Sequence, residues 1–198
     1  MACLNFPPHL WYLHENMYLM GVIPGPNKPS IDQINHAIDL IVDDLLKFWD
    51  PGVWFSRTAK YELGQLIRAI LIPLVADMLA ARQVVGFGLA TLRFFCTCCH
   101  LEIKDIENLD KSSWPDRNFQ QDLAYAKQWR DAHSLKDQVK LFKQSGICWT
   151  PLYCLPYWNL SCFTTVESMH VFKTGLVQNH CWQVWGIDVT TDGSDGTV

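Results

Sequence analysis

The feature that most constrains the fold is an apolar run of eight residues, 69–76, which ends at a single carboxylate, Asp77. Only Pro73 interrupts this run of Ala, Ile, Leu and Val. Periodicity alone does not separate a strand from a helix in so short a segment, but the length, the β-branched residues and the terminal charge favour a buried strand of an α/β sheet. Asp77 would then lie at the carboxyl end of a central strand, where open α/β sheets place functional groups.

Two interpretations of Asp77 remain open at this point. Asp77 precedes the short helical pattern MLAARQVV, so its carboxylate can accept hydrogen bonds from the free amides that begin that helix. A carboxylate at a strand end can also bind a hard divalent cation such as Mg²⁺, which proteins hold through one or two carboxylates plus substrate phosphates. A single aspartate does not distinguish the two roles.

The cysteines are unevenly distributed. Three of the eight, Cys96, Cys98 and Cys99, fall within four consecutive positions. The spacing of Cys96 and Cys99 lets two thiolates reach one tetrahedral zinc ion from a tight turn, although the pair is half a site and needs ligands from elsewhere. The first ten residues lack the charged and apolar regions of a signal peptide. We therefore expect an intracellular chain with reduced thiols, and the isolated cysteines as small buried hydrophobic residues.

The composition indicates a folded protein with material for a core. Hydrophobic residues make up 49% of the chain and nine residues are Trp, far more than a disordered segment contains. A net charge of −4 argues against a surface that is basic throughout, but it does not exclude a nucleic-acid active site built from carboxylates. Arg68, Pro73 and Asp77 cut the longest apolar stretch, so the sequence predicts no membrane span.

In the first half of the chain, strand and helix patterns alternate, which predicts an α/β fold. Apolar residues at helical spacing predict a helix over 31–49, with Ser30 as its N-cap. Strands are expected over 17–23 and near 53–58, the second as a strand or turn. A short helix is expected over 80–87, after the apolar run.

The second half of the chain differs from the first in its charge and in the spacing of its apolar residues. Segment 101–150 is charged, and its apolar spacing predicts two amphipathic helices that separate near His133, as in a helical insertion. Segment 151–188 predicts an aromatic linker, then a strand that enters a helix of about four turns. In that helix Glu167 and His170 are three residues apart, so both can face one metal ion or each other; a capping role for Glu167 and a buried structural role for His170 are equally open. Residues 189–198 read as a polar tail.

The order of several motifs resembles the transposase of Plavaka-type elements, which are abundant in mushroom-forming fungi and related to CACTA-type transposases. The resemblance covers essentially the whole chain and rests on LNFPPHL, ENMYLMGVIPGPNKPSIDQINH, DPGVWFSRTAKY, LIPLVADMLAARQVVGF, CTCCHLEIKDIENLD, LPYWN and VESMHVFKTGLVQNHCW. It implies a ribonuclease-H-like nuclease core in which three acidic residues hold two divalent metal ions for cut-and-paste DNA transposition. Segment 1–100 would be a partial core of this kind, ending in a zinc knuckle, followed by the helical insertion.

The resemblance assigns roles to individual residues. Asp77 matches the second catalytic acid of the family, Cys96 and Cys99 match its downstream zinc motif, and His170 matches a further zinc ligand. The chain also departs from the family pattern. Leu79 stands where the family usually has Pro, Cys98 adds a competing thiol, and Glu167 and Val171 replace the family's Asp and Asn on either side of Ser-Met-His.

By this resemblance the activity is phosphoryl transfer on DNA with Mg²⁺ or Mn²⁺, supported by a structural zinc ion, in the nucleus. The family's first acid would lie before Met1 and its third after Val198, so we expect the 198-residue chain to be inactive by itself. The alternative is a domesticated or relic zinc-stabilised module that binds nucleic acid or protein without catalysis. A third reading is a relic that folds poorly, because a sheet lacking its first strands exposes an edge and core surface unless a protein partner or the missing core segments cover them.

Overall fold

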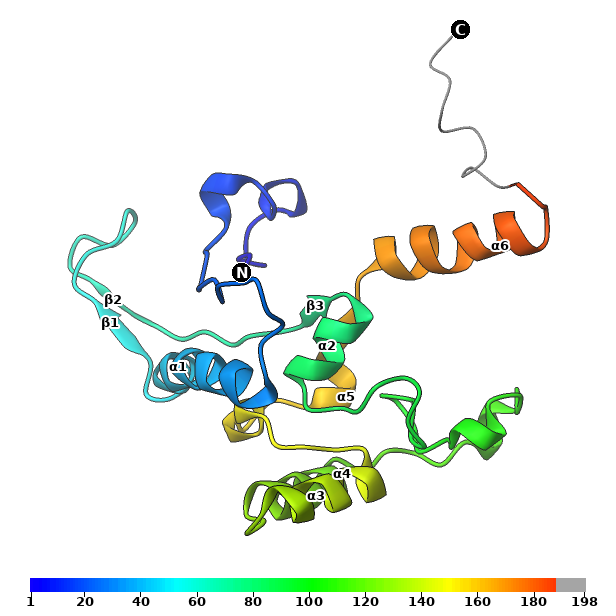
Figure 1. Cartoon of the computed structure of the whole chain (residues 1–198). Helices are drawn as coiled ribbons and strands as arrows, with labels where there is room; N and C mark the ends of the chain where they lie inside the picture. The colour runs from blue at the N-terminus through cyan, green and yellow to red at the C-terminus, as the bar shows by residue number, and fades with distance from the viewer. Residues whose placement is uncertain (188–198) are drawn as a thin grey trace, which may run out of the picture.

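The computed structural model describes residues 1–187, so the predicted polar tail, 189–198, lies outside the described residues. Figure 1 shows the helices and strands, which are α1 (Ile31–Trp49), β1 (Val53–Phe55), β2 (Gln65–Ile67), β3 (Leu74–Ala76), α2 (Met78–Val84), α3 (Phe119–Arg130), α4 (Leu135–Ser145), α5 (Leu160–Phe163), β4 (Thr164–Val166) and α6 (Gln178–Gln183). A π-helix, η6 (Met169–Val177), runs directly into α6. Short 3₁₀ turns lie at Pro8–Leu10, His14–Asn16, Ile103–Asp105, Lys111–Ser113 and Pro151–Cys154.

Helix α1 has the bounds that its apolar spacing predicts. It begins with a capping box, in which the Ser30 hydroxyl accepts from the Gln33 amide at 3.3 Å and the Gln33 side chain accepts from the Ser30 amide at 2.9 Å. Its buried face presents Ile34, Ile38, Val42 and Leu45. The predicted helix and its cap are therefore confirmed.

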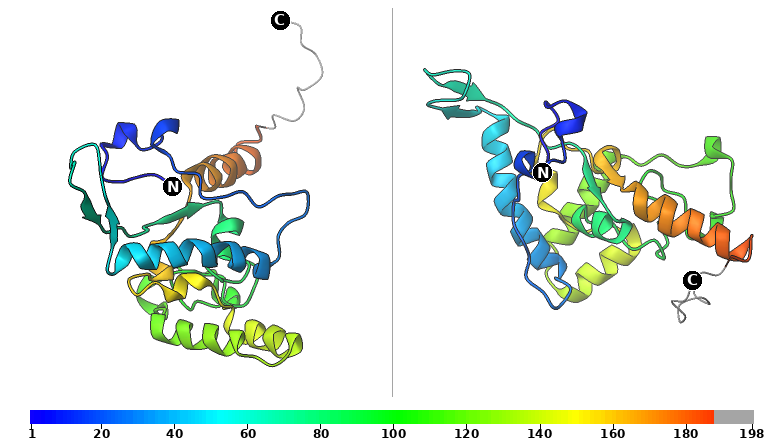
Figure 2. Two further views of the ribbon diagram at one scale, coloured as in Figure 1. Left: turned by 90° about the vertical axis from the view of Figure 1, so that its left-hand side faces the viewer. Right: turned by 90° about the horizontal axis from the view of Figure 1, so that it is seen from above.

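The strands form two small sheets. β1 and β2 pair in an antiparallel hairpin that projects from the rest of the chain (Figure 2). β3 and β4 pair in parallel, with Leu74 opposite Thr164 and Ala76 opposite Val166. This second sheet joins two segments of the chain that are far apart in sequence, and α2 and η6 leave it directly after the strands (Figure 1).

Two of the predicted strands are corrected. The apolar run 69–76 contributes only Leu74–Ala76, because Pro73 has no amide hydrogen for a ladder and pairing begins after it. Within residues 1–187 this strand has one neighbour, β4, and Val75 is 54% exposed, so β3 is neither central nor fully buried. The predicted strand 17–23 is reduced to a single bridge between Met17 and Ala2, because no neighbouring strand lies along the rest of it in this part of the structure.

One buried cluster draws its residues from between Ile34 and Leu160. It combines the α1 face with side chains that follow α2, with Ala126 of α3 and with Ile147, and its largest member, Trp158, is 1% exposed. Two long-range hydrogen bonds support it, from the Thr150 hydroxyl to the Val84 carbonyl at 2.8 Å and from the Asn35 side-chain Nδ2 to the Trp149 carbonyl at 3.0 Å. The segments 1–100, 101–150 and 151–188 thus share one core, and their division into separate units remains a prediction.

The helical prediction for the middle of the chain is confirmed. α3 and α4 are two helices that separate around His133 and lie side by side (Figures 1 and 2). Asn118 caps α3 and Ser134 caps α4 through their side chains. None of the helices in residues 1–187 combines the length and the apolar character that crossing a bilayer requires.

Candidate functional site

The parallel sheet of β3 and β4 brings two carboxylates to the same end, where both strands finish. Asp77 follows the last residue of β3, and Glu167 follows the last residue of β4. The Glu167 amide donates to the Ala76 carbonyl at 2.9 Å, which continues the ladder to the point where the two acids leave it. Because the strands are parallel, both acids emerge at the carboxyl end of the sheet, the edge at which α/β proteins bind ligands.

Asp77 is held in place by the helix that it begins. Its Oδ1 accepts from the Ala80 amide at 2.9 Å, so the N-cap interpretation is confirmed. Among the described residues, Oδ2 takes part in no hydrogen bond. The cap therefore leaves one carboxylate oxygen available for a cation, and the structural and ligand roles of Asp77 are compatible.

Glu167 and His170 face each other at the start of the last helical segment. The Glu167 Oε1 accepts from the His170 amide at 3.0 Å and also contacts Nδ1 of the same residue. The hydrogen bond from His170 lowers the pKa of Glu167, whereas partial burial and the nearby Asp77 carboxylate act in the opposite direction. Of the arrangements that the sequence left open, the structure shows mutual contact between Glu167 and His170.

Residues 96–99, which we call the cysteine segment, form a second group of candidate ligands, apart from the acids that follow β3 and β4. The Cys96 sulfur accepts from the Cys98 amide at 3.3 Å and also interacts with the buried Cys99 thiol. Burial opposes ionisation of Cys96, but its hydrogen bonds to Cys98 and Cys99, with the charge of Arg117, lower its pKa overall. Burial raises the pKa of Cys99. Cys98 is exposed, so Cys99 is the thiol that the fold places beside Cys96.

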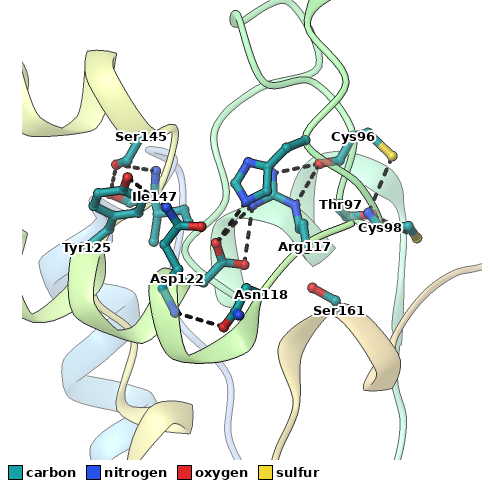
Figure 3. Close-up of polar contacts among 12 residues, drawn as sticks. Cys96, Thr97, Cys98, Arg117, Asn118, Asp122, Tyr125, Ser145, Ile147 and Ser161 are labelled. Atoms are coloured by element: carbon teal, nitrogen blue, oxygen red, sulfur yellow. Dashed lines mark hydrogen bonds and ion pairs between the residues drawn. The ribbon is translucent and has the colours of Figure 1, made fainter. Parts of the chain in front are cut away.

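A buried ion pair anchors this cysteine segment to α3 (Figure 3). Arg117 donates to the Cys96 carbonyl at 2.7 and 3.1 Å and faces Asp122 at 3.3 Å, with the two side chains only 2% and 3% exposed. His100 Nε2 lies 3.5 Å from Asp122 Oδ1. Arg82 also holds this segment, because it donates to the carbonyl oxygens of Gly88 and of Phe95, the residue before Cys96.

Sequence reasoning missed this anchor. Arg117 and Asp122 read as ordinary surface charges in a charged segment, and their spacing of five residues matches no helical pair. The available signal was the position of Arg117 in the sequence. It directly precedes Asn118, which caps α3, so this arginine was a candidate for anchoring the loop before the helix.

The predicted metal ligands fall into two places. Cys96 and Cys99 lie together, whereas His170 lies against Glu167 at the end of β4. In residues 1–187 no group of three or more His, Cys, Asp or Glu side chains is placed to hold a metal ion. The two thiols suit half of a tetrahedral zinc site, and the full ligand set with His170 remains a prediction.

Comparisons with known proteins identify the family. The model of a family described as "Transposase family tnp2" matches residues 1–138, which include β3, Asp77, the cysteine segment and α3. Glu167 and His170 lie beyond the matched range. Searches of the curated proteins and of the solved structures found no match. Because the family model covers well over half of the 198 residues, the chain belongs to the tnp2 transposase family.

Proposed function

We propose that this chain carries part of the active site of a cut-and-paste DNA transposase, with Asp77 and Glu167 as ligands for Mg²⁺ or Mn²⁺. The observation that carries the proposal is the parallel pairing of β3 with β4, from which both acids emerge at one edge. Membership of the tnp2 family supports DNA as the substrate. The finer assignment, a Plavaka- or CACTA-type element acting in a fungal nucleus, belongs to the proposal.

Each residue has a distinct task in this site. Asp77 is oriented by its capping bond to Ala80 and presents its second oxygen to the cation. Glu167 is held by His170, whose hydrogen bond lowers the pKa of Glu167 and so favours the ionised carboxylate. Carboxylate oxygens are the ligands that Mg²⁺ prefers. When bound, a metal pair activates water or a DNA 3′ hydroxyl and stabilises the leaving oxygen.

A ribonuclease-H-like core is part of the same proposal, supported by acids at the ends of adjacent parallel strands. By the family resemblance such a site uses three acidic residues, of which this chain supplies Asp77; Glu167, at the end of the neighbouring strand, is our addition to the ligand set. We therefore propose that the 198-residue chain binds a divalent cation weakly and does not cut DNA without a further acid.

Metal binding provides the test. Mn²⁺ is titrated into the wild-type chain and into D77N and E167Q, and the bound fraction is followed by electron paramagnetic resonance. Asparagine caps helices about as well as aspartate, so D77N preserves the start of α2. We expect each variant to weaken binding by about tenfold or more, since a bound divalent cation loses a charged ligand. The control is D39N, at an exposed carboxylate of α1. Equal binding by all four proteins would overturn the proposal.

A second candidate function is a zinc-stabilised binding module without catalysis, which the adjacent thiols of Cys96 and Cys99 favour. Zinc analysis of the purified chain tests it. We expect about one zinc ion per chain, lost in C96S and kept in C162S, because Cys162 is an exposed cysteine outside the pair. Full zinc content in C96S would exclude this assignment. Salt-dependent DNA binding without Mg²⁺-dependent nicking would favour the module over the nuclease.

A further inference from the structure

Helix α4 carries three lysines on one face. Lys136, Lys140 and Lys143 are spaced by four and three residues, which places them within about one sixth of the helix circumference. All three are exposed, and the opposite side of α4 holds the buried Ser145. We call Lys136, Lys140 and Lys143 the lysine face.

The lysine face is not neutralised by the described part of the chain. The exposed cations Lys47, Lys104 and Arg130 form ion pairs with nearby carboxylates, whereas none of the three lysines does so within residues 1–187. The one acid of α4 is Asp137, which is engaged at the helix start with the hydroxyl of Ser134 at 2.6 Å. Other exposed cations, such as Lys28 and Lys111, also form no ion pair in this part of the structure, so the lysine face is distinguished by three cations lying together in a chain with 20 acidic and 16 basic residues.

The face is also fixed relative to the strand-end acids. α4 ends at Gly146, whose φ of 72° reverses the chain. The Gly88 amide donates to the Gly146 carbonyl at 2.8 Å, and Phe87 pairs with Ile147, so the end of α4 is tied to the segment that follows α2. Because Asp77 caps α2, these contacts connect the end of α4 to the helix that begins beside that acid.

We propose that the lysine face binds the phosphate backbone of duplex DNA, an inference that rests on the proposed function for the choice of partner. From Lys136 to Lys143 the helix rises about 10 Å, which matches about three successive phosphates of one strand. Lysines act on phosphates as point charges and read no base sequence. The face therefore positions DNA and does not select it.

Salt-dependent binding provides the test. A labelled DNA duplex is titrated with the chain in EDTA at several salt concentrations, and fluorescence anisotropy gives the affinity. The test variant is K136Q/K140Q/K143Q. The matched control, K28Q/K47Q/K104Q, removes the same charge from exposed lysines elsewhere. Loss of three phosphate contacts should reduce the slope of log affinity against log salt by about 2 to 3 and weaken binding at least about tenfold, whereas the control should change little.

Two outcomes would overturn the inference: no binding of duplex DNA by the wild-type chain, or an equal loss of affinity in both variants. Circular dichroism checks that both variants keep the wild-type helix content. Because EDTA removes divalent cations, the result is independent of the metal test. If D77N and E167Q bind Mn²⁺ normally while the lysine face still binds DNA, the proposed function fails and this interface stands.

Discussion

Asp122 and Asp77 are both aspartates near the start of a helix, but they differ in what faces them. Asp122 is buried in α3 and paired with Arg117, so its charge is balanced inside the chain. Asp77 is half-buried at the edge of the sheet, and its acidic neighbour is Glu167. A buried carboxylate needs an internal cation, whereas like charges at a hydrated edge are tolerated and favour a cation from outside. The partner, and not the residue type, separates the structural aspartate from the one that we propose as a cation ligand.

The largest effect is expected at the structural aspartate. D122A removes the partner of the buried Arg117, and leaving a buried charge unpaired costs about 3–5 kcal/mol of unfolding free energy. Urea denaturation measures this loss. D39A, at an exposed carboxylate of α1, is the control and should change stability by less than about 0.5 kcal/mol. Similar losses in D122A and D39A would show that the contrast between buried and exposed acids is wrong.

Burial in the core also changes the pKa of one thiol, that of Cys148. It raises the pKa of Cys148 to about 12, so the folded state favours the neutral thiol, while an unfolded chain ionises near pH ~8.5. The resulting stability is present below pH ~8.5 and is lost as the pH rises toward 12, with on the order of 3 kcal/mol lost by about pH 11. Denaturation between about pH 8 and pH 11 should therefore show a shallower fall for C148A than for the wild-type chain. Parallel curves would contradict the buried, neutral state of this thiol.

At Asp77 two substitutions separate its two roles. D77A removes the bond to the Ala80 amide and should cost about 1 kcal/mol of stability, whereas D77S keeps a capping oxygen and should cost only a few tenths. Both remove the carboxylate, so both should weaken Mn²⁺ binding to the same extent. Thermal denaturation and Mn²⁺ titration of the two variants provide the measurements. Normal Mn²⁺ binding in D77S would leave Asp77 with the capping role alone.

The smallest stability effect is expected at Glu167, because its contact with His170 is exposed to solvent and weakly stabilising. The hydrogen bond from His170 lowers the pKa of Glu167, so its contribution is present above the ordinary glutamate value and is lost as the pH falls through the folded value. E167Q should therefore differ slightly from wild type at pH 7 and not at pH 3, by thermal denaturation. A difference that grows in acid would contradict this sign.

Local features of the fold were predictable from the sequence. Ser30 and the apolar spacing of 31–49 determine α1 through contacts within a few residues, and Asp77 caps α2 for the same reason. The β3–β4 pairing was not predictable, because it joins three-residue strands about 90 residues apart. One signal was present: a short β-branched segment ends at Glu167 much as the apolar run ends at Asp77. The Arg117–Asp122 pair was missed because burial of a charge depends on tertiary packing.

The distance along the chain between β3 and β4 has a consequence for the order of folding. Closing a loop of about 90 residues costs chain entropy that only the completed core repays, so this pairing should form late, after local helices such as α1. Asp77 and Glu167 stay apart in a nascent or misfolded copy. On the proposed function, such a copy has no cation site, and folding of the chain is itself the step that assembles one.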